Sequence, residues 1–141
     1  MEEDPARLER GRRLLIACAI SYAIVSLGMN LSASSATDDP ARFVRGLVRL
    51  AIGLAMFWAA GRGSTAVAGL LIALLGVAGI AGVVMAFTIA AQSIDTIVLA
   101  LMFALAFGGL SLRMAMSREL WDYVRSSRRA RAGAGETTPR A

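Results

Sequence analysis

Four long apolar runs dominate the chain, and short polar stretches separate them. The runs span residues 14–31, 43–60, 66–91 and 94–112. Each is about as long as the helix of roughly 17–25 residues that crosses a ~30 Å hydrocarbon core. The pattern therefore predicts an all-α polytopic membrane protein, built as a four-transmembrane-helix bundle over residues 14–112.

Local start and stop signals support these boundaries. Asp4-Pro5 and Asp39-Pro40 each place a capping carboxylate before a proline at the first helical position. The hairpin "AAGRGSTA" combines glycines that end a helix with hydroxyl residues that cap the next one. The residues expected in these roles are Gly61 or Gly63, and Ser64 or Thr65. The shorter link "AQSIDT" makes the third and fourth helices antiparallel neighbours, with Ser93 as the cap.

Arginines collect on one side of the predicted bundle. Four precede the first run, Arg62 lies in the hairpin, and seven lie from Arg113 onward. The positive-inside rule places this side, and both termini, in the cytoplasm. Residues 1–13 are then the cytoplasmic start of the first helix. Residues 113–141 form a cytoplasmic basic extension that continues the fourth helix amphipathically and ends in a disordered tail.

The first apolar run also has features of a signal peptide. It follows an arginine-rich segment and precedes the small residues of "SASSA". Cleavage would remove residues 1–36 and leave three spans. The run is longer than a signal-peptide core of roughly 7–15 residues, so a retained helix is favoured and cleavage stays an open alternative.

Arg49 is the least expected residue within the predicted spans. A charged arginine at the centre of a membrane helix costs roughly 2.5–3.5 kcal/mol on insertion scales. Counting ~1.5 Å per residue from Arg62 places Arg49 ~20 Å into the membrane. The same counting brings polar residues of the first and third helices to this level. We therefore predict a polar pocket in the outer half of the bundle. Its members are Tyr22, Ser26, Asn30, Arg42, Arg45, Arg49, Thr88, Gln92 and Asp95.

The same polar residues also fit a structural role. Interfacial arginines extend toward lipid phosphates, and Ser, Thr and Asn form interhelical hydrogen bonds that contribute about 0.6 kcal/mol each. Both interpretations stay open at this point.

Small residues at four-residue spacing predict contact between the third and fourth helices, because helix association in lipid depends on close approach. The predicted contact residues are Ala78, Gly82, Ala86, Ala90, Ala100, Ala104 and Gly108. Gly69, Gly76 and Gly79 are expected to face other directions, where they could serve a homo-oligomer.

The basic extension contains a predicted anchor at the inner surface. Trp121 and Tyr123 have the amphipathic side chains typical of headgroup level. Arg125, Arg128 and Arg129 would attract anionic lipid headgroups at about 1 kcal/mol each.

Composition narrows the possible chemistry. The chain is 57% hydrophobic and has no histidine, no lysine and a single cysteine, Cys18. We expect no catalytic constellation, no cofactor site and no metal site. The net charge of +5 comes from arginines that flank apolar runs, so nucleic acid is not an expected partner.

The layout resembles that of small four-span bacterial inner-membrane proteins with a short basic hairpin between helices 2 and 3. This resemblance implies location in a bacterial cytoplasmic membrane and no particular activity. Small multidrug exporters have a glutamate in their first helix, whereas residues 14–31 contain no carboxylate. We expect a non-enzymatic accessory or partner-binding subunit, which binds another membrane protein or itself. The alternative is a small oligomeric channel, transporter or membrane-perturbing effector.

Overall fold

The computed structural model describes residues 5–35, 40–88 and 94–136. Within these residues the chain forms five helices, namely α1 (Pro5–Ser35), α2 (Pro40–Gly61), α3 (Thr65–Thr88), α4 (Ile94–Met116) and α5 (Arg118–Glu136). Four of the described helices contain segments long and apolar enough to cross a membrane. The predicted all-α fold with four spans is therefore confirmed.

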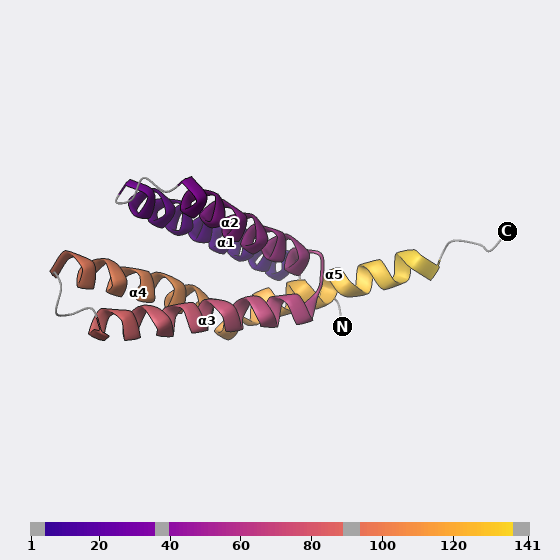
Figure 1. Cartoon of the computed structure of the whole chain (residues 1–141). Coiled ribbons are helices and arrows are strands. Elements are labelled where there is room, and N and C mark those ends of the chain that lie inside the picture. The colour runs from indigo at the N-terminus through magenta and orange to yellow at the C-terminus, as the bar shows by residue number, and fades with distance from the viewer. Residues whose placement is uncertain (1–4, 36–39, 89–93, 137–141) are drawn as a thin grey trace.

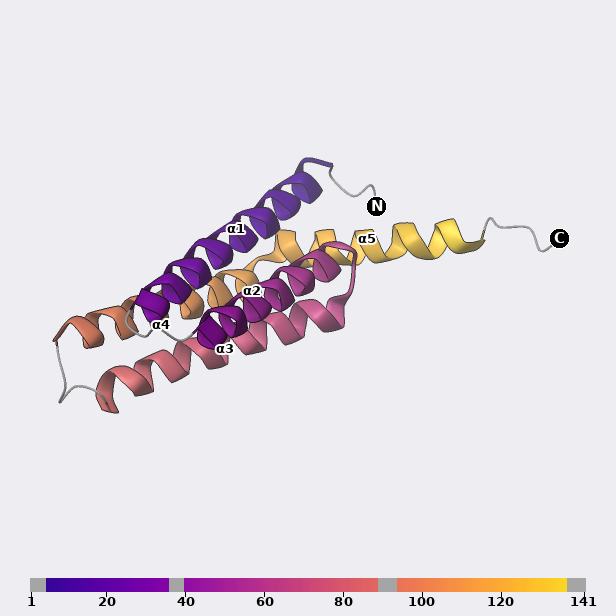
Figure 2. The same cartoon turned by 45° about the horizontal axis from the view of Figure 1, so that its top comes forward.

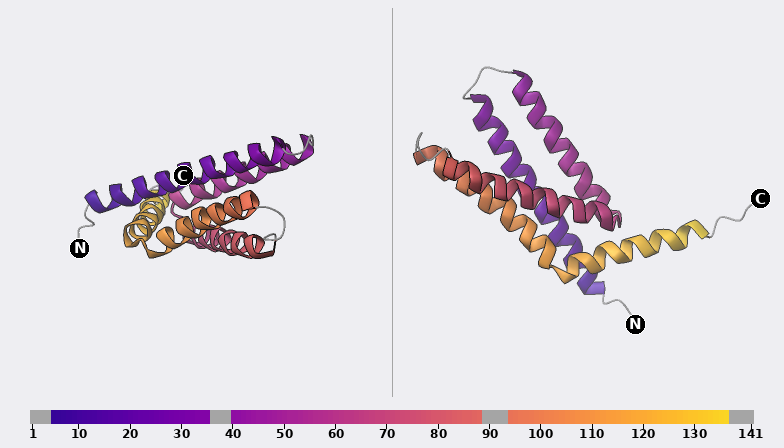
Figure 3. Two further views of the ribbon diagram at one scale, coloured as in Figure 1. Left: turned by 90° about the vertical axis from the view of Figure 1, so that its left-hand side faces the viewer. Right: turned by 60° about the horizontal axis from the view of Figure 1, so that its bottom comes forward.

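The four long helices are arranged as two antiparallel pairs, α1 with α2 and α3 with α4 (Figure 1). The pairs meet at the end formed by the first half of α1, the α2–α3 turn and α5, which we call the basic end. They diverge toward the opposite end (Figures 1 and 3). From the basic end, α5 extends past the rest of the bundle (Figures 1 and 2).

The turn at the basic end follows from its sequence. Gly63 has φ of 91°, a conformation that glycine adopts without steric cost. The Ser64 N–H donates to the carbonyl of Ala59 at 3.3 Å, and the Gly63 N–H donates to that of Ala60 at 2.9 Å. These two bonds form a Schellman motif that ends α2. The Ser64 Oγ then accepts from the Val67 N–H at 3.4 Å and caps α3. The other expected caps, Asp4, Asp39 and Ser93, lie outside the described residues.

Contact between α3 and α4 depends on side chains that are small or absent. A Cβ atom on Gly79 would lie 2.8 Å from the backbone nitrogen of Gly108, and one on Gly82 would lie 3.1 Å from the Cβ of Ala104. The two backbones therefore approach each other closely, which increases dispersion contact where lipid supplies no hydrophobic force.

A buried hydroxyl adds a polar contact to this helix pair. Ser111 of α4 is buried, and its Oγ donates to the backbone carbonyl of Ile72 of α3 at 2.8 Å. A Cβ on Gly76 would lie 3.2 Å from the same Oγ. The contact thus extends from Gly82 toward the basic end.

The small residues expected in this contact occupy different positions. Gly82, Ala86 and Ala104 are buried, Ala78, Ala100 and Gly108 are half-buried, and Ala90 lies outside the described residues. The expectation that Gly76 and Gly79 face other directions is wrong, because both contact α4. Helices pack through rows of side chains at three-residue as well as four-residue spacing. The prediction considered only the rows at four-residue spacing.

Two glycine substitutions on α3 separate close packing from helix propensity. Alanine favours a helix over glycine by about 1 kcal/mol, so Gly69→Ala, where a Cβ meets nothing within 4 Å, should raise the melting temperature in detergent or leave it unchanged. Gly79→Ala should lower it, because its Cβ would collide with the backbone of Gly108. Equal shifts for the two variants, measured by circular dichroism, would contradict this packing.

Candidate functional site

Two polar side chains of α1 fit into notches on α2. Asn30 lies against Gly46, and the Tyr22 ring lies against Gly53, where any larger residue would collide with them. The Asn30 Nδ2 donates to the carbonyl of Phe43 at 3.2 Å. The Tyr22 hydroxyl donates to the carbonyl of Arg49 at 3.3 Å. Both side chains therefore bind the backbone of the neighbouring helix.

Tyr22 also joins the helix pairs through its ring. The ring centroids of Tyr22 and Phe57 of α2 are 5.6 Å apart, and those of Tyr22 and Phe107 of α4 are 5.8 Å apart. Aromatic pairs at this separation stabilise a fold beyond the area that they bury. Tyr22 thus contacts both α2 and α4 where the pairs come together.

The three arginines of α2 lie outside this contact. Arg42, Arg45 and Arg49 are exposed, and the Arg45 Nε donates to the carbonyl of Ala41 on its own helix at 3.2 Å. Among the described residues, no hydrogen bond or ion pair reaches the Arg49 guanidinium. Ser26 is half-buried on α1.

The remaining members of the predicted pocket belong to the other helix pair. Thr88 ends α3, and its Oγ1 donates to the carbonyl of Val84 at 3.0 Å. Asp95 is exposed in the first turn of α4, where a carboxylate interacts favourably with the helix dipole. Gln92 lies outside the described residues. Because the two pairs diverge at this end (Figure 1), the structure does not bring Thr88 and Asp95 together with the α2 arginines.

The basic end contains a cluster of fully buried apolar side chains. Met114, Leu120 and Val124 have no exposed surface, and they form one cluster with Leu15 and Cys18 of α1. A hydrophobic core therefore continues from the spans into α5.

A serine separates α5 from α4. The Ser117 Oγ accepts from the Leu120 N–H at 3.2 Å, which caps the new helix. The predicted amphipathic extension is present as a helix, α5, which Ser117 separates from α4. The disorder expected from residue 125 onward is wrong as far as Glu136, where α5 ends. Residues 125–136 contain arginine and alanine, which favour helix, and the preceding residues Leu120 and Val124 hold the start of α5 on the core.

Two glycines allow α5 to lie directly on the bundle. A Cβ on Gly11 of α1 would collide with the backbone of Glu119 and lie 2.8 Å from the Cβ of Tyr123. A Cβ on Gly63 would lie 2.5 Å from the backbone nitrogen of Arg128. The first turns of α5 therefore contact α1, and its middle contacts the α2–α3 turn.

Ion pairs between α1 and α5 supplement this packing. The Arg10 Nε lies 3.1 Å from an oxygen of Glu119. Arg7 and Asp122 are 4.0 Å apart. Exposed pairs of this kind contribute at most about 1 kcal/mol each, so they orient α5 more than they hold it.

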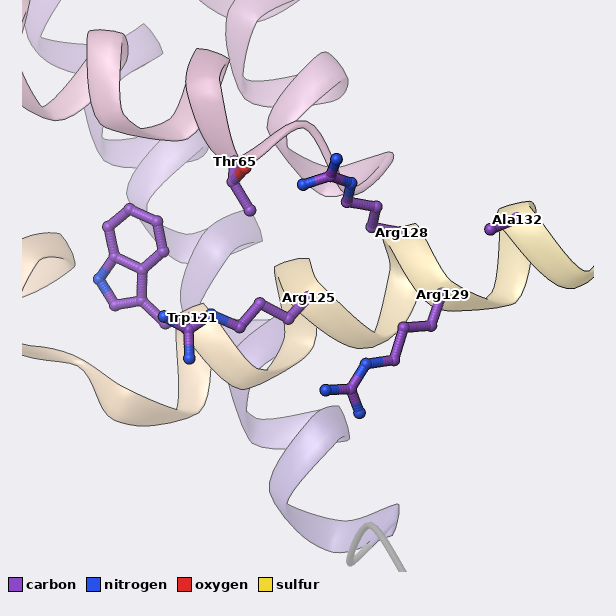
Figure 4. A pocket seen from close by; sticks show the side chains of 6 residues that line it. All are labelled: Thr65, Trp121, Arg125, Arg128, Arg129 and Ala132. Atoms are coloured by element: carbon purple, nitrogen blue, oxygen red, sulfur yellow. The ribbon is translucent and has the colours of Figure 1, made fainter.

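An open cavity of about 510 Å³ lies between α5 and the start of α3, lined by Thr65, Trp121, Arg125, Arg128, Arg129 and Ala132 (Figure 4). In Figure 4 the side chain of Arg125 extends toward Trp121 below Thr65, and that of Arg128 extends toward the α2–α3 turn. The Trp121 Nε1 donates to the carbonyl of Ala115 at 3.3 Å, which links the indole to α4. The arginines thus line the α5 side of this open cavity.

The chemistry available at this site is anion binding. Three of its six lining residues are arginines, and guanidinium groups bind carboxylates and phosphates through paired hydrogen bonds. No carboxylate among the described residues forms an ion pair with Arg125 or Arg128. Within the same residues, no group of three or more His, Cys, Asp and Glu could hold a metal ion.

The exposed surface of the four long helices consists largely of apolar side chains. Ile80, Phe87 and Leu105 are 67%, 78% and 75% exposed, which suits contact with lipid and not with water. With four candidate spans, the chain is a small multi-pass α-helical membrane protein. No family model, characterised protein or solved structure matches the chain.

Two hydroxyl deletions test whether Tyr22 joins helices. Tyr22→Phe should destabilise the protein by about 0.6 kcal/mol, and by no more than about 1.7 kcal/mol, because it removes the donor to the Arg49 carbonyl and keeps the ring. Thr88→Val should change stability little, since Thr88 donates within its own helix. Unfolding in detergent measures the stability of both variants. Equal losses of stability would show that the hydrogen bond from Tyr22 to α2 contributes nothing.

Proposed function

We propose that this protein is a non-enzymatic accessory subunit of a membrane assembly, and that the arginine-rich face of α5 binds an acidic segment of its partner. The observation that carries this proposal is a basic helix fixed to the bundle by buried side chains, close glycine contacts and ion pairs. A fixed helix loses little conformational entropy when it binds, which increases affinity.

The direction of α5 supports a protein partner. The helix extends beyond the bundle (Figure 1), so its second half is carried away from the apolar spans. Arg125, Arg128 and Arg129 line the open cavity, and arginine is enriched at protein interfaces. An acidic segment would complement these charges.

The orientation is part of the same proposal. The basic end carries most of the arginines, so we place it in the cytoplasm of a bacterial cell, with the spans in the inner membrane. Burial of Leu15 and Cys18 against α5 supports retention of α1 in the mature protein. Protease added to spheroplasts, which lack the outer-membrane barrier, should leave α5 uncut, and cleavage there would contradict this orientation.

The polar residues of the predicted outer pocket have structural roles in this proposal. Hydrogen bonds of Tyr22 and Asn30 to α2 favour a structural role for both. Arg49 is expected to extend toward the headgroups opposite the basic end. A ligand-handling pocket around Arg49 stays a prediction, which normal function of an Arg49→Leu variant would oppose.

Site-specific crosslinking in the cells that produce the protein tests partner binding. A photo-crosslinking residue at Ala132, which lines the cavity, should give one discrete protein adduct. Charge reversal by Arg125→Glu with Arg128→Glu should reduce its yield about tenfold or more, since two favourable pairings become repulsive. A control crosslinker at Leu105, which is exposed on α4, should not depend on these arginines.

Two outcomes would contradict the proposal. An Ala132 adduct unaffected by charge reversal would show that the arginines do not select the partner. A defined homo-oligomer in mild detergent that conducts ions in liposomes would instead favour a channel or transporter. The accessory subunit should be monomeric and show no flux.

A further inference from the structure

A second cavity lies at the basic end, between α1, α2 and α5. Its volume is about 420 Å³, within the roughly 300–1,000 Å³ typical of ligand sites. It shares no lining residue with the cavity beside Thr65. It is therefore a different site from the proposed partner interface.

This groove has a polar mouth and an apolar wall. Arg12 of α1, Arg62 of the turn and Tyr123 of α5 supply the mouth, and residues such as Ile16 and Leu54 supply the wall. Ile16 and Leu54 are 46% and 38% exposed, so the apolar wall is open at the surface of the bundle. The wall is thus continuous with the lipid-facing surface. A molecule inserted in the membrane could reach the groove from this side.

The mouth carries excess positive charge. Arg12 shares its carboxylate, Glu9, with Arg13, because Glu9 lies 3.6 Å from Arg12 and 3.2 Å from Arg13. One carboxylate therefore faces two guanidinium groups. Arg62 lies 3.9 Å from the ring centroid of Trp58, and no carboxylate among the described residues forms an ion pair with it. A cation–π contact positions a guanidinium without neutralising its charge.

The depth of the mouth suits a lipid headgroup. Trp58 and Arg62 lie at the end of the α2 span, which stops at Gly61. Tryptophan, tyrosine and arginine are typical of the boundary between hydrocarbon and water. Basic pockets between transmembrane helices at this level bind phospholipid headgroups.

We propose that this groove binds one anionic phospholipid. Arg12 and Arg62 bind the headgroup phosphate, with the Tyr123 hydroxyl available as a further donor. One acyl chain lies along Ile16 and Leu54. The apolar wall selects a lipid over a free phosphate, and the excess of guanidinium groups selects an anionic headgroup over a zwitterionic one.

Native mass spectrometry of the purified full-length protein in detergent tests this site. Phosphatidylglycerol should bind with a stoichiometry of one, more tightly than phosphatidylcholine with the same chains. Arg12→Gln and Arg62→Gln should each weaken its binding about fivefold, the effect of one arginine near an anionic headgroup. Arg118→Gln is the matched control, because Arg118 is exposed, does not line the groove and forms no ion pair with Glu9. It should leave binding unchanged.

Further variants separate the acyl chain from the phosphate. Leu54→Trp fills the groove without changing charge, so it should prevent binding of phosphatidylglycerol. Glycerol 3-phosphate should not compete. In a Trp121→Phe background, Trp58 is the remaining tryptophan, and its fluorescence should respond to phosphatidylglycerol alone.

Four results would overturn the proposal. Equal binding of the two lipids would remove the headgroup selectivity, and equal weakening by Arg118→Gln would show general charge attraction. Competition by glycerol 3-phosphate would show that the acyl chain is not recognised. Unchanged binding to Leu54→Trp would place the lipid elsewhere on the protein.

Discussion

Close approach of backbones is the interaction on which this structure depends. Hydrocarbon chains are as apolar as leucine, so helices in a membrane gain little from burying apolar surface against each other. They associate where side chains are small and polar groups can reach a neighbouring backbone. Gly79 and Gly82 provide this in α3, and Gly46 and Gly53 accept Asn30 and Tyr22 on α2.

The same kind of contact attaches α5 to the spans. Gly11 and Gly63 bring its backbone against α1 and the α2–α3 turn, while Leu120 and Val124 join the core. This attachment holds several arginines in fixed positions, and it places Tyr123 at the mouth of the groove beside Arg12 and Arg62. Both proposed sites therefore depend on the docked position of α5.

Hydropathy and turn residues were enough to predict the four spans and the hairpin at Gly63 and Ser64, because these features depend on local sequence. The polar face of Tyr22, Ser26 and Asn30 was also visible. The acceptors were not, because Tyr22 and Asn30 bind backbone carbonyls, which no side-chain pattern reveals. The signal available in the sequence was a pair of glycines on α2, Gly46 and Gly53, which are seven residues apart and leave room for these side chains. The docked α5 was missed because its contacts are distant in sequence.

The most direct test of this account measures whether α5 is fixed in a membrane. Spin labels replace Ala81 of α3 and Ala130 of α5, both exposed, with Cys18 changed to Ala, and double electron–electron resonance is recorded in lipid nanodiscs. The account predicts one narrow distance distribution. Gly11→Leu should broaden it, because the added side chain displaces Glu119 and Tyr123, whereas Gly28→Leu, which meets nothing within 4 Å, should not. A broad distribution in the unmodified background would contradict the docked α5.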